Sequence, residues 1–183
     1  VAGAFDNFGY AVALSPDGSR AIVGAWGDDT ASGANAGSAH SFVRSGTTWS
    51  DEGSLFAPDG AAGDQFGIAV ALSADGSRAL VGVERDATAG GTITGSARIF
   101  LRSGATWLEE GSLLAPGGAM FDSFGYAVAL SSDGTRAIVG AFADDTPAGV
   151  DAGSAHVFTI ALAPNGSTCG TDAACASGFC VDG

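Results

Sequence analysis

The sequence predicts an all-β protein, built as a β-propeller-type array of four-stranded antiparallel blades. Three observations lead to this prediction. One unit of 58 residues occurs three times. Each unit holds short apolar runs separated by turns rich in glycine and aspartate. The composition, with 30 glycines and only 15% charged residues, suits many short strands better than long helices.

The repeat is read directly from three matching segments. The segment 6–15, Asp-Asn-Phe-Gly-Tyr-Ala-Val-Ala-Leu-Ser, returns with small changes at 64–73 and again at 122–131. The Gly-Ser-Ala runs at 37–39, 95–97 and 153–155 keep the same spacing, so no insertion separates the copies. Chance does not produce this register, and the units are therefore one structural module used three times.

Each unit contains four candidate strands. In the first unit they cover 10–14, 20–25, 38–44 and 49–57. An Asp-Gly pair at 17–18 supplies the positive φ values that a tight hairpin needs. Four antiparallel strands make one blade, and blades bury their apolar faces against one another in a propeller. A solenoid of stacked sheets is the rival architecture.

The domain organisation follows the repeat. Residues 1–160 hold the three units, at about 4–61, 62–119 and 120–160, and the last lacks its fourth strand because the pattern ends after Phe158. Residues 161–183 are a linker and the start of a cysteine-rich module. Three blades are fewer than the roughly four to eight of a closed propeller. We therefore expect a larger ring of about seven blades, completed by further blades of the same parent chain or of other copies.

In each unit a Phe-Gly pair is followed about fifteen residues later by a second motif, which is Val23-Gly24-Ala25, Val81-Gly82-Val83 or Val139-Gly140-Ala141. With these motifs the units resemble the FG-GAP repeat, the repeat of the integrin α-subunit propeller and of many bacterial surface proteins. The resemblance implies a propeller and a place outside the cell or at its surface. Many such repeats carry a calcium loop of several aspartates between the first two strands. Here one carboxylate stands in each loop, at Asp17, Asp75 and Asp133, too few for the roughly six to eight oxygens that calcium takes.

The usual calcium site is therefore expected to be lost. An arginine follows each of these aspartates three residues later, as Arg20 follows Asp17. A local ion pair or a hydrogen bond that stabilises the hairpin is the simpler interpretation.

All three cysteines, Cys169, Cys175 and Cys180, lie in the last fifteen residues. Their segment resembles the start of the cysteine-rich repeats in surface proteins of myxobacteria. We expect them to form disulfides in an oxidising compartment, one with a partner beyond the sequence, rather than a zinc site.

Charge and hydropathy exclude two classes of partner. The net charge is −13, which repels the phosphates of nucleic acids and anionic membranes. No apolar run is long enough to span a bilayer. No cofactor is required by any pattern in the sequence.

The best candidate site is the loop after the second strand of each unit. It carries Asp28-Asp29-Thr30, Asp86-Ala87-Thr88 and Asp144-Asp145-Thr146. The clustered oxygens of Asp28, Asp29, Asp144 and Asp145 could bind a calcium ion weakly, or could accept hydrogen bonds from the hydroxyls of a sugar. The alternative is that these side chains bond to their own turns.

Aromatic residues give a second set of candidates. Trp26 and Phe142 precede two of these loops and could form a binding platform, or could pack between blades. The phenylalanines of the Phe-Gly pairs, with Trp49 and Trp107, are expected to pack between blades.

No catalytic residue is predicted. His40 and His156 occupy one repeat position on different units, and we expect both on the surface of a strand. No serine or cysteine stands in a pattern that indicates an activated nucleophile. The expected function is non-catalytic recognition or adhesion, with a protein or glycan as ligand. The alternative is a structural subunit or spacer of an extracellular assembly or filament, and a propeller hydrolase comes third.

Overall fold

The computed structural model describes residues 3–161, and these residues form β-strands and turns with no helix among them. The cysteines and the linker of residues 162–183 lie outside the described part. Repeat 1 forms β1 (Ala11–Leu14), β2 (Arg20–Ala25), β3 (Ser38–Ser45) and β4 (Thr48–Leu55). Repeat 2 forms β5 (Phe66–Leu72), β6 (Arg78–Val83), β7 (Ser96–Ser103) and β8 (Thr106–Leu113). Repeat 3 forms β9 (Phe124–Leu130), β10 (Arg136–Ala141) and β11 (Ser154–Thr159).

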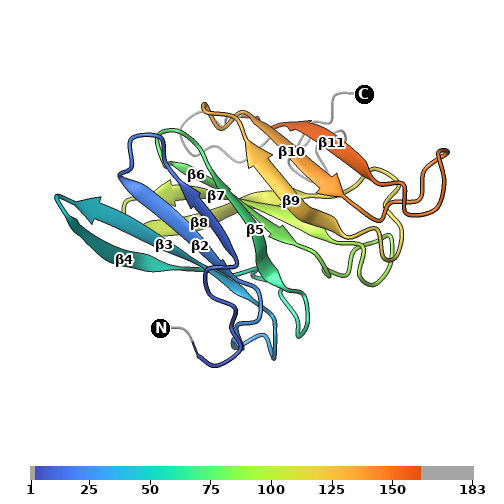
Figure 1. Ribbon diagram of the computed structural model, residues 1–183, viewed down its shortest axis with the longest axis horizontal. Helices are drawn as coiled ribbons and strands as arrows, with labels where there is room; N and C mark the ends of the chain where they lie inside the picture. Colours follow the sequence, from blue (N-terminus) through green and yellow to red (C-terminus); the bar gives the residue numbers. More distant parts are fainter. Residues whose placement is uncertain (1–2, 162–183) are drawn as a thin grey trace.

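Each repeat folds into its own antiparallel sheet, in which the strands follow one another in chain order. The first two sheets have four strands, and the described part of the third has three. Figure 1 shows the three sheets side by side, with β5 between β1 and β9. The first strand of each repeat therefore lies at the inner edge of the array, and the fourth strands of the first two repeats, β4 and β8, lie at its outer edge. The prediction of an all-β array of blades is confirmed.

The core lies between the sheets rather than inside any one of them. One cluster joins Ile22, Ala39 and Leu55 of repeat 1 to Phe66 and Val81 of repeat 2. The strands alternate, so that neighbouring residues of β2 or β6 point to the two opposite faces of their sheet. A single blade cannot bury both of its faces, and this is why the repeats must pack against one another.

Two of the aromatic residues expected to pack between blades, Trp49 and Phe8, are less buried than the others. Trp49 is exposed, whereas its equivalent Trp107 packs at the edge of the core between repeats 1 and 2. Phe66 and Phe124 are fully buried, but Phe8 is partly exposed although its ring meets those of His40 and Phe42 edge-on. The expectation that all these aromatics lie between blades is therefore wrong for Trp49 and only partly right for Phe8. The reason is that β4 is an outer strand and that no described sheet covers the first face of repeat 1.

Candidate functional site

The loop after the second strand has the same backbone in all three repeats. In repeat 1 it contains a tight turn in which Thr30 and Gly33 exchange two backbone hydrogen bonds, at 3.1 and 3.0 Å. The same paired bonds join Thr88 to Gly91 and Thr146 to Gly149. Backbone hydrogen bonds therefore hold the loops in one conformation, so the loop side chains can differ between repeats without changing it.

The aspartates of these loops bond to the turn, as one interpretation of the sequence predicted. Asp29 Oδ1 accepts a hydrogen bond from the backbone N–H of Asn35 at 2.9 Å, and Asp145 Oδ1 accepts one from Asp151 at 2.8 Å. Asn35 and Asp151 have positive φ angles of 51° and 50°. These bonds hold the two carboxylates in place but occupy only one oxygen of each.

Asp28 belongs to a second, more buried chain of hydrogen bonds. The Ser38 hydroxyl donates to Asp28 Oδ2 at 2.6 Å and lies 3.1 Å from Nε2 of His40. The other ring nitrogen of His40, Nδ1, lies 3.0 Å from the Ser54 hydroxyl. His40 is therefore buried, and the expectation that it lies on the surface is wrong. His156 is half-buried and lies 2.9 Å from the Ser154 hydroxyl.

The geometry at Ser38 does not activate it as a nucleophile. Because the hydroxyl gives its proton to Asp28, the ring nitrogen that faces it is left as a donor rather than a base. Ser38 is also fully buried. Burial lowers the pKa of His40, with the carboxylate of Asp51 acting in the opposite direction, so the ring is held in its neutral form.

In repeat 2, Arg98 stands where the other repeats have histidine. Its guanidinium contacts Asp86 at 2.7 Å, Asp59 at 2.9 Å and Glu109 at 3.1 Å. Burial acts to lower the pKa of Arg98, but the hydrogen bond and charge of Asp86, with the bonds to Asp59 and Glu109, raise it. Asp86 is thus part of an internal ion-pair network, whereas Asp28 and Asp29 form no ion pair among the described residues.

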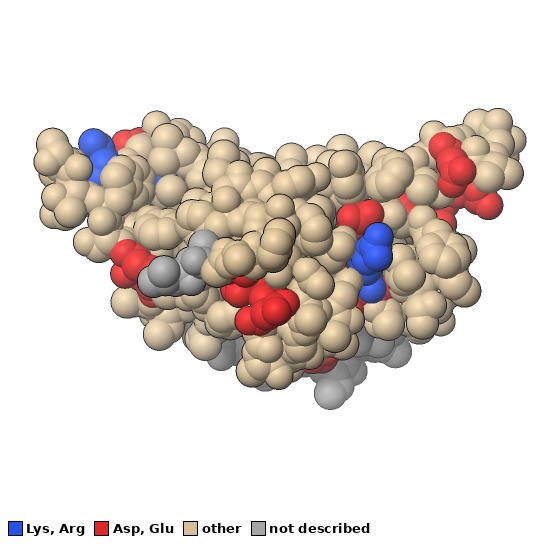
Figure 2. Space-filling model, turned by 60° about the horizontal axis from the view of Figure 1, so that its bottom comes forward, with Lys and Arg blue, Asp and Glu red and all other residues tan. Residues whose placement is uncertain are grey.

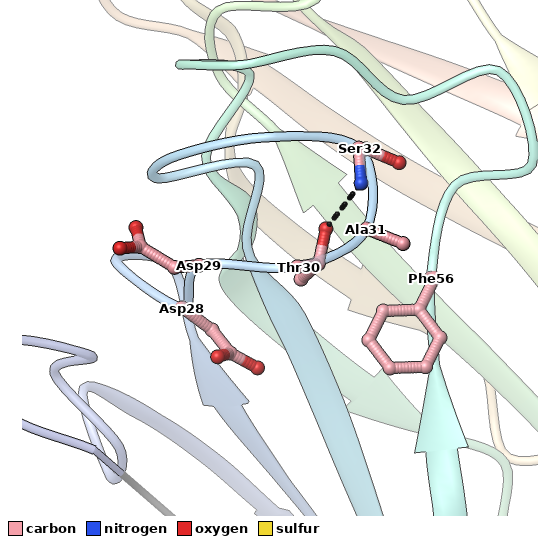
Figure 3. A pocket seen from close by; sticks show the side chains of 6 residues that line it. All are labelled: Asp28, Asp29, Thr30, Ala31, Ser32 and Phe56. Atoms are coloured by element: carbon pink, nitrogen blue, oxygen red, sulfur yellow. Dashed lines mark hydrogen bonds between the residues drawn. The ribbon is translucent and has the colours of Figure 1, made fainter.

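A cavity opens beside the loop of repeat 1. Its volume is about 340 Å³, and it is lined by Asp28, Asp29, Thr30, Ala31, Ser32 and Phe56. Figure 3 shows the Phe56 ring extending from the end of β4 toward the loop that carries Thr30 and Asp28. The Thr30 hydroxyl accepts a hydrogen bond from the backbone N–H of Ser32 at 3.1 Å. This bond fixes the part of the cavity wall that Thr30, Ala31 and Ser32 form.

Two of the predicted ligand residues, Asp28 and Asp29, therefore meet in one cavity. Trp26 is not part of its lining, and Phe142, Asp144 and Asp145 lie in another repeat. Phe56 was missed by the sequence analysis. The signal was present, because Phe56 stands between the buried Leu55 and Ala57, and strand alternation turns such a residue outward.

Trp26 and Phe142 belong to a second group, which we call the inner-edge cluster: Tyr10, Trp26, Glu84, Tyr126 and Phe142. The ring of Trp26 meets Tyr10 edge-on with centroids 6.1 Å apart, and Phe142 meets Tyr126 at 4.7 Å. The pKa of Tyr10 is raised by its side-chain hydrogen bond with Tyr126 and also by the negative charge of Glu84. Tyr10 and Tyr126 belong to repeats 1 and 3, so all three repeats contribute to this cluster.

Trp26 and Phe142, the two residues of the predicted aromatic platform, thus each pair with a tyrosine at the inner edge, and ligand binding there stays a prediction. Phe142 is exposed and Trp26 is half-buried. The Trp26 Nε1–H is buried and has no hydrogen-bond partner within the described residues. The partners Tyr10 and Tyr126 were missed, because their meeting depends on how the first and third sheets are placed.

The aspartates of the hairpin loops cap their turns. Asp17 Oδ1 accepts hydrogen bonds from the Ser15 hydroxyl at 2.6 Å and from the Ser19 backbone N–H at 2.9 Å. Arg20 forms its ion pair with Glu52 of β4 instead, and Arg78 pairs with Glu110 at 2.7 Å. Of the two interpretations offered for these loops, the turn hydrogen bond is correct and the Asp17–Arg20 ion pair is not formed.

Two further observations concern metals and membranes. Within residues 3–161, no three or more His, Cys, Asp or Glu side chains are grouped so as to hold a metal ion. Weak calcium binding at Asp28, Asp29, Asp144 and Asp145 stays a prediction. None of the elements between residues 3 and 161 is an apolar helix of bilayer-spanning length.

Solved structures with a similar fold include Sqt1 of Saccharomyces cerevisiae and the hydrazine synthase of Kuenenia stuttgartiensis. The TM-score is 0.51 for each, at 13% and 14% sequence identity. The matches cover 86% and 87% of this chain but 33% and 34% of those chains, so the protein spans about a third of their length. At this identity the likeness concerns the fold alone. A search of curated proteins finds no match.

The sequence itself matches a family pattern in all three repeats. The FG-GAP repeat pattern covers residues 2–42, 49–100 and 107–158. These ranges include the Phe-Gly pairs, the inner-edge cluster and the loop of the repeat 1 cavity. The chain belongs to the FG-GAP repeat family and forms a β-propeller-type module of such repeats.

Proposed function

We propose that this protein is a non-catalytic recognition module that acts outside the cell or at its surface, and that its ligand is a glycan bound in the cavity of repeat 1. The observation that carries the proposal is the cavity itself, which is lined by the acidic residues Asp28 and Asp29 and by the exposed ring of Phe56. The FG-GAP repeats support the location, since such repeats are typical of extracellular proteins.

The chemistry of the cavity fits a sugar. An ionised carboxylate only accepts hydrogen bonds, so the cavity requires a ligand that offers donors such as hydroxyl groups. An aromatic ring offers an apolar face on which the C–H face of a pyranose can lie. The volume of about 340 Å³ lies at the small end of the range for ligand sites, roughly 300–1,000 Å³. One or two sugar rings fill such a space.

The site is also held in position before a ligand arrives. Asp28 is fixed by the Ser38 hydroxyl and Asp29 by the Asn35 backbone N–H. A site whose side chains are already ordered loses less conformational entropy on binding, and this favours affinity. The rigid sheets below the loop serve as the scaffold.

The test is binding to a glycan array, followed by calorimetry on the best ligand with matched variants. Asp29→Ala and Phe56→Ala should each weaken binding about tenfold or more, equivalent to about 1.4 kcal/mol. Asp145→Ala is the control for the first, because Asp145 makes the same turn hydrogen bond in repeat 3. Leu114→Ala is the control for the second, because Leu114 is the exposed residue at the matching position of repeat 2.

The controls should bind as the parent chain does. Equal loss in Asp29→Ala and Asp145→Ala would show that the turn and not the cavity matters. Saturable glycan binding that survives both cavity variants would place the ligand elsewhere and contradict the proposal.

The inner-edge cluster favours a second candidate, the recognition of a protein through a cationic side chain. Rings of tyrosine and phenylalanine attract an arginine or lysine by cation–π interaction, and Glu84 lies near the same rings with a negative charge. The excess of acidic over basic residues on the face shown in Figure 2 also favours a basic partner.

This candidate is tested with a short arginine-containing peptide as probe. Binding should weaken in Phe142→Ala and in Glu84→Gln, but not in Phe121→Ala, which removes an exposed phenylalanine outside the cluster. Retention of affinity in both cluster variants would exclude the inner-edge cluster as the peptide site.

A further inference from the structure

The interface between repeats 1 and 2 is built from two distinct sheet faces. We call the face that a repeat turns toward the preceding repeat its leading face and the opposite one its trailing face. The leading face of repeat 2 carries Phe66, Ala79, Val81, Val83 and Phe100. It packs on a trailing face of repeat 1 that carries Ile22, Ala39, Leu55 and Ala57.

The interface between repeats 2 and 3 uses nearly the same positions, displaced by 58 residues, with Ile99 taking part where repeat 1 has Ser41. The leading face of repeat 3 carries Phe124, Ala137, Val139, Ala141 and Phe158, and it packs on Leu80, Ala97, Ile99 and Leu113 of repeat 2. One mode of docking is therefore used twice within the chain.

Glycines set the distance of this docking. A Cβ atom built on Gly24 would lie 2.0 Å from the carbonyl oxygen of Gly67, and one built on Gly82 would lie 1.9 Å from that of Gly125. The adjoining backbones also form parallel bridges, Gly37 with Phe66 and Gly95 with Phe124. The Phe-Gly pair of one repeat thus fits against glycines on the trailing face of the repeat before it.

Among residues 3–161, nothing covers the leading face of repeat 1. Phe8 is 43% exposed, while Phe66 and Phe124 at the same position are 1% and 0% exposed. Val12 and Leu14 are also exposed, although their equivalents Val70 and Leu72 pack on the core.

No described residue of another repeat covers the trailing face of repeat 3 either. Ile138 and Val157 are exposed, whereas Ile22 and Ile99 at the matching positions are fully buried. Two shallow hollows of about 220 and 230 Å³ lie on this face, and Ile138 lines both. A Cβ atom on Gly140 would meet only atoms of Ala127, the nearest at 3.6 Å. The glycine that receives a Phe-Gly pair in the other two repeats therefore has none here.

From these two faces we propose that the leading face of repeat 1 of a second copy of this chain docks on the trailing face of repeat 3, in the manner of the two interfaces within the chain. The Phe8-Gly9 pair of repeat 1 already has the backbone conformation of the docked Phe-Gly pairs. Gly9 has a φ angle of 93°, and the docked Gly67 and Gly125 have 91° and 94°. An unrelated partner would have to reproduce this backbone and the phenylalanine before it, whereas a second copy carries them already.

Such a contact joins unlike surfaces, so it repeats from copy to copy. Heterologous contacts close into a ring when the rotation between copies permits and otherwise extend into an open chain. Either product buries apolar side chains that stand exposed in the single chain, and removes them from water.

The first experiment measures the mass of the full chain by light scattering over a hundredfold range of concentration, with a reductant present to prevent disulfide cross-links. The expected mass rises with concentration or stays at a multiple of the single chain. A single-chain mass throughout the range would overturn the proposal, and the two faces would then belong to another occupant.

The second experiment uses one variant on each face. Gly140→Ala adds a methyl group that fits the single chain but meets the incoming carbonyl group, and Val12→Lys places a charge on the leading face. Each should weaken self-association at least tenfold while the thermal unfolding of the single chain stays cooperative. Leu108→Lys adds the same charge to an exposed position of β8 outside both faces and should associate normally.

Mixing the two variants distinguishes this contact from a symmetric one. Gly140→Ala keeps an intact leading face and Val12→Lys keeps an intact trailing face, so the mixture should form one-to-one dimers that grow no further. A mixture with no dimer, or a Gly140→Ala chain that associates as well as the parent chain, would overturn the proposal.

Discussion

Gly24 of β2 and Gly67 of β5 lie so close that a single methyl group on the first would come within 2.0 Å of the carbonyl oxygen of the second. In repeats 1 and 2 the Val-Gly segment therefore receives the Phe-Gly pair of the next repeat. The two parts of the repeat that lie about fifteen residues apart in sequence meet across the boundary between blades. The repeat pattern thus records contacts between neighbouring blades as well as folding within one blade.

The first prediction follows from this contact. Gly24→Ala and Gly82→Ala should each destabilise the chain by about 1–3 kcal/mol or more, because the added methyl group meets backbone that has no room to shift. For a chain of this size, each kcal/mol lowers Tm by about 2–4 °C. Thermal unfolding followed by circular dichroism measures the effect.

Gly140→Ala is the matched control, since the same change at the same repeat position meets no atom closer than 3.6 Å. Its stability should stay within about 0.5 kcal/mol of the parent chain when both are measured dilute enough to be single chains. An equal loss of stability in all three Gly→Ala variants would show that the destabilisation arises within each strand and not from contact between blades.

The sequence predicted the blades well because their determinants are local. The second strand of repeat 1 was expected at 20–25 and β2 is found at Arg20–Ala25, since alternation of apolar residues and the Asp-Gly turn before it fix both ends. The loop of repeat 1 was also identified as the best site candidate, and Asp28 and Asp29 do line a cavity there. Turn chemistry and strand alternation act over a few residues and can be read from the chain.

What could not be predicted depends on partners far apart in sequence. Arg20 pairs with Glu52 because β3 brings β4 into register, and that register shifts at a bulge between Ser41 and Phe42. Tyr10 meets Tyr126 only because the first and third sheets converge at the inner edge. These contacts follow from the placement of strands and sheets, which the repeat pattern does not contain.

The second prediction concerns the ion-pair network of repeat 2. Arg98→Ala should destabilise the chain by about 3–5 kcal/mol, because it leaves the buried carboxylate of Asp86 without its counter-ion. Arg102→Ala removes an arginine of the same strand that bonds to backbone carbonyls nearer the surface, and it should cost about 1 kcal/mol or less. Urea unfolding at pH 7 measures the free energy of unfolding of both variants and distinguishes the two expected losses. A small loss in Arg98→Ala would show that Asp86 is hydrated in the folded state.

The third prediction concerns the hairpin aspartates. Hydrogen bonds from Ser15 and from the Ser19 backbone lower the pKa of Asp17 to about 2, and Ser131 and Thr135 do the same for Asp133. The folded pKa lies below the unfolded one, so this contribution to stability is present above about pH 4. It is lost as the pH falls through about 2. Carboxyl NMR titration should find both groups at these low values.

Ser15→Ala tests the cause within one molecule. It removes the first of the hydrogen bonds to Asp17, so the pKa of Asp17 should rise toward its ordinary value while that of Asp133 stays about 2. If Asp17 titrates as before in this variant, the serine hydroxyl is not what holds its pKa down.

The fourth prediction concerns the pH dependence of folding through His40. Burial lowers the pKa of His40 below its ordinary value of 6.5, so the folded state prefers the neutral ring more than the unfolded state does. This contribution to stability is therefore fully present above the unfolded pKa and declines as the pH falls below it toward the folded pKa. Urea unfolding at pH 7 and pH 5 should show the decline, and NMR titration of the ring should place the His40 pKa below 6.5.

His40→Gln removes the titrating ring and should flatten the dependence of stability on pH between 7 and 5. His156→Gln leaves His40 with its partners Ser38 and Ser54, so in this variant the decline assigned to His40 should persist. An unchanged decline in His40→Gln would assign the effect to other groups. Either water would then reach the ring of His40 in the folded protein, or the carboxylate of Asp51 would offset the effect of burial on the pKa of His40.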